Sequence, residues 1–467
     1  MADDLISRPR PVYVLGAGFS KAIHENMPIT DQLGRQIKER LPTGFDMSGI
    51  EAGGFEDWLT LRLSELPFLE GHVNKMRRAE AERVIAEIAG ILDDHVAEAS
   101  ATSCPLWLQQ LILLWHSERA IVITFNYDTL LEQAINLVRP VINGSPLATT
   151  VYADQIVFPA PPGPPAEYMI DTASHNSQSF QILKLHGSLN WYWAVGDPTG
   201  STLVRMREKR VLGSVPLTID YDFAGAKTLD RYLIPPVTAK DGYYNSYLSH
   251  ALWRSASDSI RIAPRITLMG YSMPANDRVT VELINQSNAT FEIVDLDPGS
   301  PEDPRTLAGR IARLGPVDST TGGATAISDF VSKKLKSTAS ALSSATVVAD
   351  SGREGDNVVL AVPSRRGVSF YCLYEDQDEA IQTYQIDPSL ARGSSSPLNE
   401  IAYNQMPRAK QSVDLGDFFN RRKLRARLES SGPLVINASD GQLVAVSAVE
   451  MTVERWKMIR LCAAPLG

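Results

Sequence analysis

The stretch VYVLGAGFSKA, residues 12–22, is typical of a buried β-strand that turns directly into a helix. Its first residues are apolar, and Gly16, Ala17 and Gly18 follow before Ser20 opens a helical segment. Glycines let the backbone approach a ligand, and the first amides of a helix can hydrogen-bond an anion such as a phosphate. The full G-x-G-x-x-G spacing is absent, and a turn that needs glycine only for its shape would leave the same pattern.

Further apolar runs follow this stretch at regular intervals up to about residue 298. AIVITFN, QILKLHG, RITLMGYS and FEIVDLD alternate with helical or loop segments. This alternation predicts an α/β domain with a Rossmann-like, mostly parallel sheet. Helical spacing of apolar residues between about 55 and 100 indicates an inserted helical module, and a Pro-rich excursion between about 141 and 179 precedes one of the motifs and can cover a site there.

The composition changes after residue 310. We predict a domain at residues 1–310, a linker rich in Ser, Thr, Ala and Gly at 311–357, and a smaller β-rich domain at 358–467. The last domain contains the strand-like runs NVVLAVPS, VSFYCLYE and IQTYQID, and SDG at 439–441 reads as a hairpin turn. Nothing in it indicates a catalytic motif, so we expect it to sense a trigger or bind a partner.

Composition excludes several classes of protein. The chain has 467 residues, 44% hydrophobic and 21% charged, which is typical of two or three globular domains. Its formal net charge of -9 argues against a protein that mainly neutralises nucleic-acid phosphates. Cys104, Cys372 and Cys462 are too far apart for a zinc ribbon or a disulfide framework, and no signal peptide or membrane span is evident. We therefore expect a cytoplasmic protein without zinc and without a membrane contact.

Polar residues follow three of the apolar runs, at the strand ends where open α/β sheets bind their ligands. Asn126 and Asp128 come after one run, and His186 ends another. Asp128 or Thr129 could instead cap the next helix, and a lone histidine is often a structural residue. No His, Cys or carboxylate near His186 has metal-ligand spacing, so we expect no metal there.

Two later strand ends repeat the pattern. ITLMGYSMPANDRV, residues 266–279, places Gly270 and Ser272 after a strand, with Asp277 nearby. FEIVDLDP ends a strand with Asp295 or Asp297, where a carboxylate can accept a hydrogen bond from a ribose hydroxyl. Each feature is also common in ordinary turns and caps, so the argument depends on their order along the chain.

That order, GAGFS, TFNYD, KLHGS, GYSMPANDR and VDLDP, resembles the Sir2 superfamily, and in detail its bacterial Sir2-like branch, over roughly the first 300 residues. The resemblance implies a Rossmann-like domain that binds NAD, with Asn126 and His186 as the catalytic pair. It implies that Asn126 holds the nicotinamide ribose or positions the attacking water, and that His186 contacts the ribose hydroxyls and acts as acid or base. The residues that it assigns to the cofactor are Gly16, Ala17, Gly18, Phe19, Ser20, Asp128, Gly270, Ser272 and Asp295.

The resemblance also has two departures. Deacylating sirtuins carry a four-cysteine zinc module, which three scattered cysteines cannot form, and the Pro-Asp-Phe-Arg run of that family is replaced by MPITDQLG. Both departures favour similarity to the Sir2-like effectors of antiphage systems, which consume NAD. The expected activity is hydrolysis of the nicotinamide–ribose bond in a regulated homo-oligomer, controlled by a nucleotide signal or by a partner such as an ATPase, an Argonaute-like protein or a phage component.

Two other hypotheses stay open at this point. A protein deacylase or ADP-ribosyltransferase would keep NAD and change the substrate. A non-catalytic sensor would bind NAD or ADP-ribose without turnover, although such a protein has no need of both Asn126 and His186.

Overall fold

The computed structural model describes residues 9–41, 50–138, 180–193, 204–205, 208, 210–213, 230–237, 244, 247–274, 277–341, 346–349, 359–364, 367–375, 381–386, 434–438, 443–453 and 456–466. The chain divides into two compact units. The first comprises Met1–Ser103, Arg119–Gln133 and Ala153–Ala326, and the second comprises Cys104–Glu118, Ala134–Tyr152 and Ile327–Gly467. The Pro-rich excursion at 141–179 lies outside the described residues, so its role as a cover for the site stays a prediction.

The first unit is built on a parallel sheet of six strands in the order β3-β2-β1-β7-β8-β9. Both faces of β1 are buried, as its continuous apolar sequence predicts for a central parallel strand covered on two sides. The strands are β1 (Val12–Leu15), β2 (Ile121–Thr124), β3 (Gln181–Lys184), β7 (Arg265–Met269), β8 (Thr290–Val294) and β9 (Val317–Thr321).

The strand order reverses at β1. From β1 the chain adds β2 and β3 on one side and β7, β8 and β9 on the other. In open α/β sheets this reversal leaves a crevice at the carboxyl ends of the two strands that flank it, and ligands bind there. The architecture confirms the predicted Rossmann-like sheet and places its switch point between β1 and β7.

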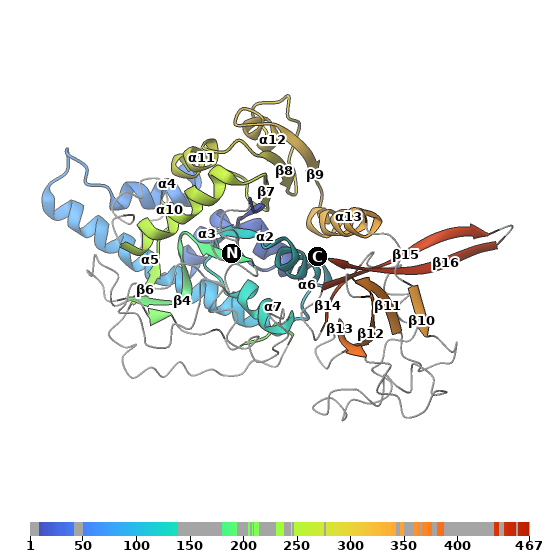
Figure 1. The fold of residues 1–467 in the computed structure, drawn as a ribbon. Helices are drawn as coiled ribbons and strands as arrows, with labels where there is room; N and C mark the ends of the chain where they lie inside the picture. Colours follow the sequence, from blue (N-terminus) through green and yellow to red (C-terminus); the bar gives the residue numbers. More distant parts are fainter. Residues whose placement is uncertain are drawn as a thin grey trace. The chain divides into compact units, whose positions relative to one another are not determined.

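Helices follow the strands of the first unit. Helices α3, α4 and α5 pack on one another, and Figure 1 shows α4 and α5 side by side in blue. Gly34 permits the close approach of α3 to α4, because a Cβ atom there would lie 2.7 Å from the Cβ of Phe55. α4 and α5 cover most of the stretch at about 55–100 that was expected to be a helical module, and α3 precedes it. The helices are α2 (Ala17–Ile23), α3 (Thr30–Arg40), α4 (Ile50–Leu63), α5 (Gly71–Ser100), α10 (Tyr247–Ile262), α11 (Arg278–Asn285) and α12 (Leu307–Ile311), and the first residues of α7 (Leu130–Val138) also belong to this unit.

A small antiparallel sheet continues directly from β3. Its order is β5-β4-β6, with β5 (Val204–Arg205), β4 (Gly187–Trp193) and β6 (Asp230–Leu233). Gly187 has φ +84°, and a Cβ atom there would lie 2.0 Å from the carbonyl oxygen of Tyr232. Glycine is therefore required where the chain leaves the parallel sheet after His186 and enters β4.

The second unit contains α6 (Leu106–Glu118), α13 (Ala326–Ala341) and a seven-stranded sheet. Neighbouring strands pair antiparallel except β13 and β14, which pair in parallel. The strands confirm the predicted β-rich C-terminal part, and β14 pairs antiparallel with β15 around the expected SDG turn, which lies outside the described residues. They are β10 (Thr346–Ala349), β11 (Val359–Ser364), β12 (Gly367–Glu375), β13 (Ile381–Ile386), β14 (Leu434–Ala438), β15 (Leu443–Val453) and β16 (Trp456–Leu466).

The prediction of a linker at 311–357 is wrong for much of its length. β9 is the sixth strand of the parallel sheet, α13 is a helix of 16 residues, and β10 is a strand of the second sheet. β9 has the polar sequence VDSTT, and alternate residues of this strand are exposed. Its composition therefore resembled that of a linker. The domains predicted at 1–310 and 358–467 stay a prediction.

Candidate active site

The register of the parallel sheet brings the polar strand ends to one edge. Thr124 pairs with Leu15 on one side and with Lys184 on the other, so Asn126 and His186 each lie two residues beyond a paired position. On the other side of β1, Met269 pairs with Leu15 and with Val294. The residues Gly16, Gly270 and Asp295 therefore each lie one residue beyond a paired position. Residues from five separate sequence motifs thus reach the carboxyl edge at nearly the same level.

Three glycines make a close backbone contact at the switch point. The Gly18 amide donates to the Gly270 carbonyl at 2.9 Å, and the Gly16 amide donates to that of Met269 at 3.3 Å. A Cβ atom on Gly16 or Gly18 would lie 2.7 or 2.9 Å from the Gly270 oxygen. The close approach explains these glycines structurally. Because the Gly18 amide is engaged inside the protein, its contact with a phosphate is still only a prediction.

A chain of hydrogen bonds joins the GAGFS motif to the TFNYD motif. The Asn126 side-chain nitrogen donates to the Gly16 carbonyl and to Ser20 Oγ, both at 2.8 Å. Ser20 Oγ donates to Asp128 Oδ2 at 2.6 Å, and both side chains are buried. A carbonyl and a carboxylate can only accept, so the direction of every bond in this chain is determined. The Asn126 amide oxygen is then the atom left to accept a hydrogen bond from a water or a hydroxyl.

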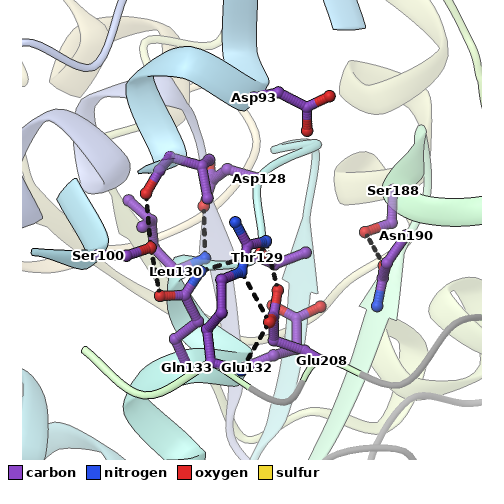
Figure 2. Close-up of polar contacts among 12 residues, drawn as sticks. Asp93, Ser100, Asp128, Thr129, Leu130, Glu132, Gln133, Ser188, Asn190 and Glu208 are labelled. Carbon is purple, nitrogen blue, oxygen red and sulfur yellow. Dashed lines mark hydrogen bonds and ion pairs between the residues drawn. The ribbon is translucent and has the colours of Figure 1, made fainter. Parts of the chain in front are cut away.

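Asp128 combines the two roles that its sequence position allowed. Its Oδ1 atom accepts from the Leu130 amide at 3.1 Å, which is the start of α7 (Figure 2). Its Oδ2 atom accepts from Ser20. The carboxylate therefore both caps the helix and orients the serine, so the capping hypothesis and the pocket hypothesis are compatible.

His186 lies among aromatic rings. Its ring is 4.9 Å from that of Phe125 and 6.3 Å from that of Tyr127, centre to centre, and the residue is only 7% exposed. Its carbonyl accepts from the Ile234 amide at 2.8 Å, which holds the backbone after β3. The ring is thus held by packing from the residues on either side of Asn126.

Tyr271 was not expected in this cluster. Its ring centre is 4.9 Å from that of Phe125, and its hydroxyl donates to Asp277 Oδ2 at 2.8 Å. Burial raises the pKa of Tyr271 well above its usual value, and the Asp277 charge raises it further, so the hydroxyl stays protonated. Tyr271 directly follows Gly270 in the motif GYSMPANDR, and its position after that glycine is the signal in the sequence that could have placed it here.

Ser272 and Asp295 lie at the same edge, but no hydrogen bond among the described residues joins either to the Ser20–Asn126–Asp128 chain. Ser272 is exposed, and its carbonyl accepts from Arg310 at 2.7 Å. Asp295 Oδ1 accepts from the Asp297 amide at 3.3 Å. Burial raises the pKa of Asp295 above its usual value, as expected of a carboxylate whose water is partly excluded.

Other polar contacts near the site are structural. Ser188, which follows His186 and Gly187, donates to Asn190 at 2.7 Å (Figure 2). Gln133 on α7 accepts from Ser100 at the end of α5, also at 2.7 Å. Within the residues that the structure describes, no three His, Cys, Asp or Glu side chains are grouped as metal ligands, and no helix is long and apolar enough to cross a membrane.

Comparison with known proteins gives one family. Residues 120–292 match the model of the SIR2-like domain, a stretch that runs from β2 to the middle of β8 and includes Asn126, His186 and Gly270. No curated protein matches the sequence.

Solved structures of Sir2 proteins and sirtuins also match the chain, at low identity and low TM-score. A Sir2 protein bound to an acetylated peptide has 13% identity and a TM-score of 0.33, covering 72% of this chain and 96% of its own. A structure concerned with sirtuin substrate affinity has 15% identity and a TM-score of 0.29, covering 67% and 95%. A Sir2 complex with the inhibitor EX-527, 2'-O-acetyl-ADP-ribose and a deacetylated p53 peptide has 14% identity and a TM-score of 0.31, covering 72% and 96%.

Proposed function

We propose that the first unit binds NAD+ and hydrolyses the bond between nicotinamide and ribose. The observation that supports this most is the directed chain Asn126–Ser20–Asp128 at the switch point of the sheet, with His186 at the next strand end. The match of residues 120–292 to the SIR2-like domain supports a role with NAD in general. The Asn126 amide oxygen and the His186 imidazole are groups that can hydrogen-bond the hydroxyls of a ribose or a water molecule.

Each residue has a definite task in this proposal. Asn126 uses both of its N–H groups on Gly16 and Ser20, so its amide oxygen is fixed as the acceptor that orients a water molecule or a ribose hydroxyl. Asp128 acts through Ser20, which it holds in one rotamer. NAD supplies a positively charged leaving nicotinamide, so the protein has to orient water and stabilise developing positive charge at the ribose.

His186 is placed for proton transfer or for holding ribose hydroxyls. Its ring packs beside the rings of Phe125 and Tyr127 and is largely buried. General acid–base groups contribute about 10²–10⁴-fold to a rate, so loss of the imidazole should abolish measurable turnover.

The proposal extends to control. We propose that the chain is a regulated antiphage effector and a homo-oligomer, in which the strand-rich second unit senses a trigger or binds a partner protein. An enzyme that destroys a central cofactor has to be inactive until it is needed. The support is the resemblance to Sir2-like effectors and the presence of a second unit in which we find no catalytic motif among the described residues.

The test is release of nicotinamide from NAD+ by the purified protein, followed by chromatography with and without a lysate of phage-infected cells. Asn126→Ala and His186→Ala should each lose turnover and stay folded, because each of the two neutral hydrogen bonds that the Asn126 side chain donates contributes only about 1 kcal/mol. The exposed residues Asn285 and His72 supply matched controls, and Asn285→Ala and His72→Ala should retain activity. Turnover that persists in both site variants would contradict the assignment.

Two other results would point elsewhere. NAD binding without turnover under either condition favours a non-catalytic sensor, and turnover only when an acylated peptide is added favours a deacylase. Calorimetric titration with NAD+ and an acyl-peptide assay separate these outcomes.

A further inference from the structure

A buried ion pair lies beside the proposed site and has no part in the mechanism above. Lys184 is the last residue of β3, Glu132 is in the first turn of α7, and the Lys184 Nζ and Glu132 Oε1 atoms are 2.7 Å apart. Their side chains are only 2% and 4% exposed. Both charges have therefore lost their water, which is costly for a protein unless the groups bond closely.

Lys184 holds a second acceptor. Its Nζ atom donates to the backbone carbonyl of Asp128 at 2.7 Å. This carbonyl belongs to the turn between β2 and α7, which carries Asn126, and Lys184 itself stands two residues before His186. One ammonium group thus connects the two strand ends that bear the proposed catalytic residues.

The packing beside the turn leaves a small void on this side. A small cavity of about 10 Å³ is lined by the polar groups of Ser20, Asn126, Asp128, Glu132 and Lys184, together with apolar side chains of the sheet and helices. Glu132 Oε2 has no hydrogen-bond partner among the described residues. Side chains around a void lack contacts on one side, so the hydrogen bond from Lys184 adds support to the turn here.

We propose that Lys184 and Glu132 are positioning residues for the NAD-cleaving site: Glu132 holds the ammonium group of Lys184, which fixes the Asp128 carbonyl and with it the turn that carries Asn126. This inference rests on the proposed function. Burial raises the pKa of Glu132 and the Lys184 charge lowers it, which agrees with a carboxyl group that depends on its partner.

The alternative is that the pair serves stability alone. Replacing both members of a buried ion pair by apolar residues of similar size is often neutral for folding, whereas removing one member leaves a buried charge. The double variant Glu132→Leu/Lys184→Met should therefore fold, yet it lacks the bond to the Asp128 carbonyl. Arg265 and Glu292, 3.1 Å apart between β7 and β8, give a matched control in Arg265→Met/Glu292→Leu.

The experiment measures kcat and KM for nicotinamide release, with thermal melts, in wild type and both double variants. A displacement of about 1 Å at a reacting group can cost 10²-fold in rate, so we expect kcat about 100-fold below wild type in Glu132→Leu/Lys184→Met with little change in KM. The control should keep the wild-type kcat. A folded Glu132→Leu/Lys184→Met variant with wild-type kcat, or an equal loss in the control, would overturn the proposal.

Hydrogen exchange of the backbone amides of residues 126–130 tests the same idea without turnover. We expect these amides to exchange faster in Glu132→Leu/Lys184→Met than in wild type or in the control. If wild type releases no nicotinamide, the proposed function fails while this readout still applies. Unchanged exchange would overturn the positioning role by itself.

Discussion

Replacing Gly270 by alanine should damage NAD binding more than it damages folding. Gly270 directly follows β7 and has φ +58°, a conformation that costs an L-residue about 1–2 kcal/mol. A Cβ atom there would lie 2.3 Å from the Phe19 amide nitrogen and 2.5 Å from the Gly18 carbonyl carbon. Both atoms belong to the backbone of the GAGFS turn, so no side chain can move aside.

The expected loss of stability and binding in Gly270→Ala follows from the overlap between the new Cβ atom and the backbone of the GAGFS turn. An ordinary contact begins at 3.4 Å, so the turn has to move by about 1.1 Å, from 3.4 minus 2.3. Overpacking of this kind costs about 1–3 kcal/mol beyond the strain of the backbone. A shift of about 1 Å near reacting groups is worth about 10²-fold in activity.

Gly323→Ala is the matched control. Gly323 has φ +104°, but a Cβ atom there meets nothing within 4 Å, so this variant carries backbone strain without crowding. Thermal melts and calorimetric titration with NAD+ should show a moderate loss of stability in Gly323→Ala with normal binding. Gly270→Ala should lose more stability and most of its affinity for NAD+. Equal behaviour of the two variants in both assays would refute the argument from close approach.

Two further predictions concern single polar groups. Ser20→Ala removes the donor to Asp128 Oδ2 and leaves a buried carboxylate oxygen unsatisfied, which costs about 1–3 kcal/mol of stability that thermal melts should show. In kinetic assays the KM for NAD+ should rise more than kcat falls. A wild-type KM would contradict this prediction. Burial raises the pKa of Asp295 in the folded protein above its ordinary value of 3.8. The stability that the protonated carboxyl group contributes is therefore fully present below pH 3.8 and is lost as the pH rises through the pKa of the folded state. Asp295→Asn should therefore raise the melting temperature at pH 7, with a gain that disappears toward pH 4, and melts that show no gain at pH 7 would count against this reasoning.

The strands of the parallel sheet could be predicted from their composition. β1, β2, β3, β7 and β8 are short apolar runs because both faces of each strand are covered. β9 could not be recognised in the same way, since alternate residues of this strand are exposed and the sequence VDSTT reads as a loop. The strand at the other edge, β3, is largely buried, so the cover that a strand receives depends on the tertiary structure and has no local signature.

In the site, too, some residues could be predicted from the sequence and others could not. Asn126, Asp128 and Ser20 follow strand ends and were predicted from that position, and they are joined by hydrogen bonds. Lys184 was missed as a partner of Glu132, because a lysine in the run QILKLHG carries no sign of what lies opposite. A charged residue inside an otherwise buried strand is nevertheless a signal that a partner must exist.

By itself, the sequence determined which residues stand at strand ends, because apolar runs, glycines and polar residues follow from local burial and backbone geometry. Only the tertiary structure decided which of these ends meet. The order β3-β2-β1-β7-β8-β9 places Gly16 beside Gly270, which are 254 positions apart in the chain, and brings Lys184 to the turn that carries Asn126. Strand order and register depend on long-range pairing, which no local stretch of sequence encodes.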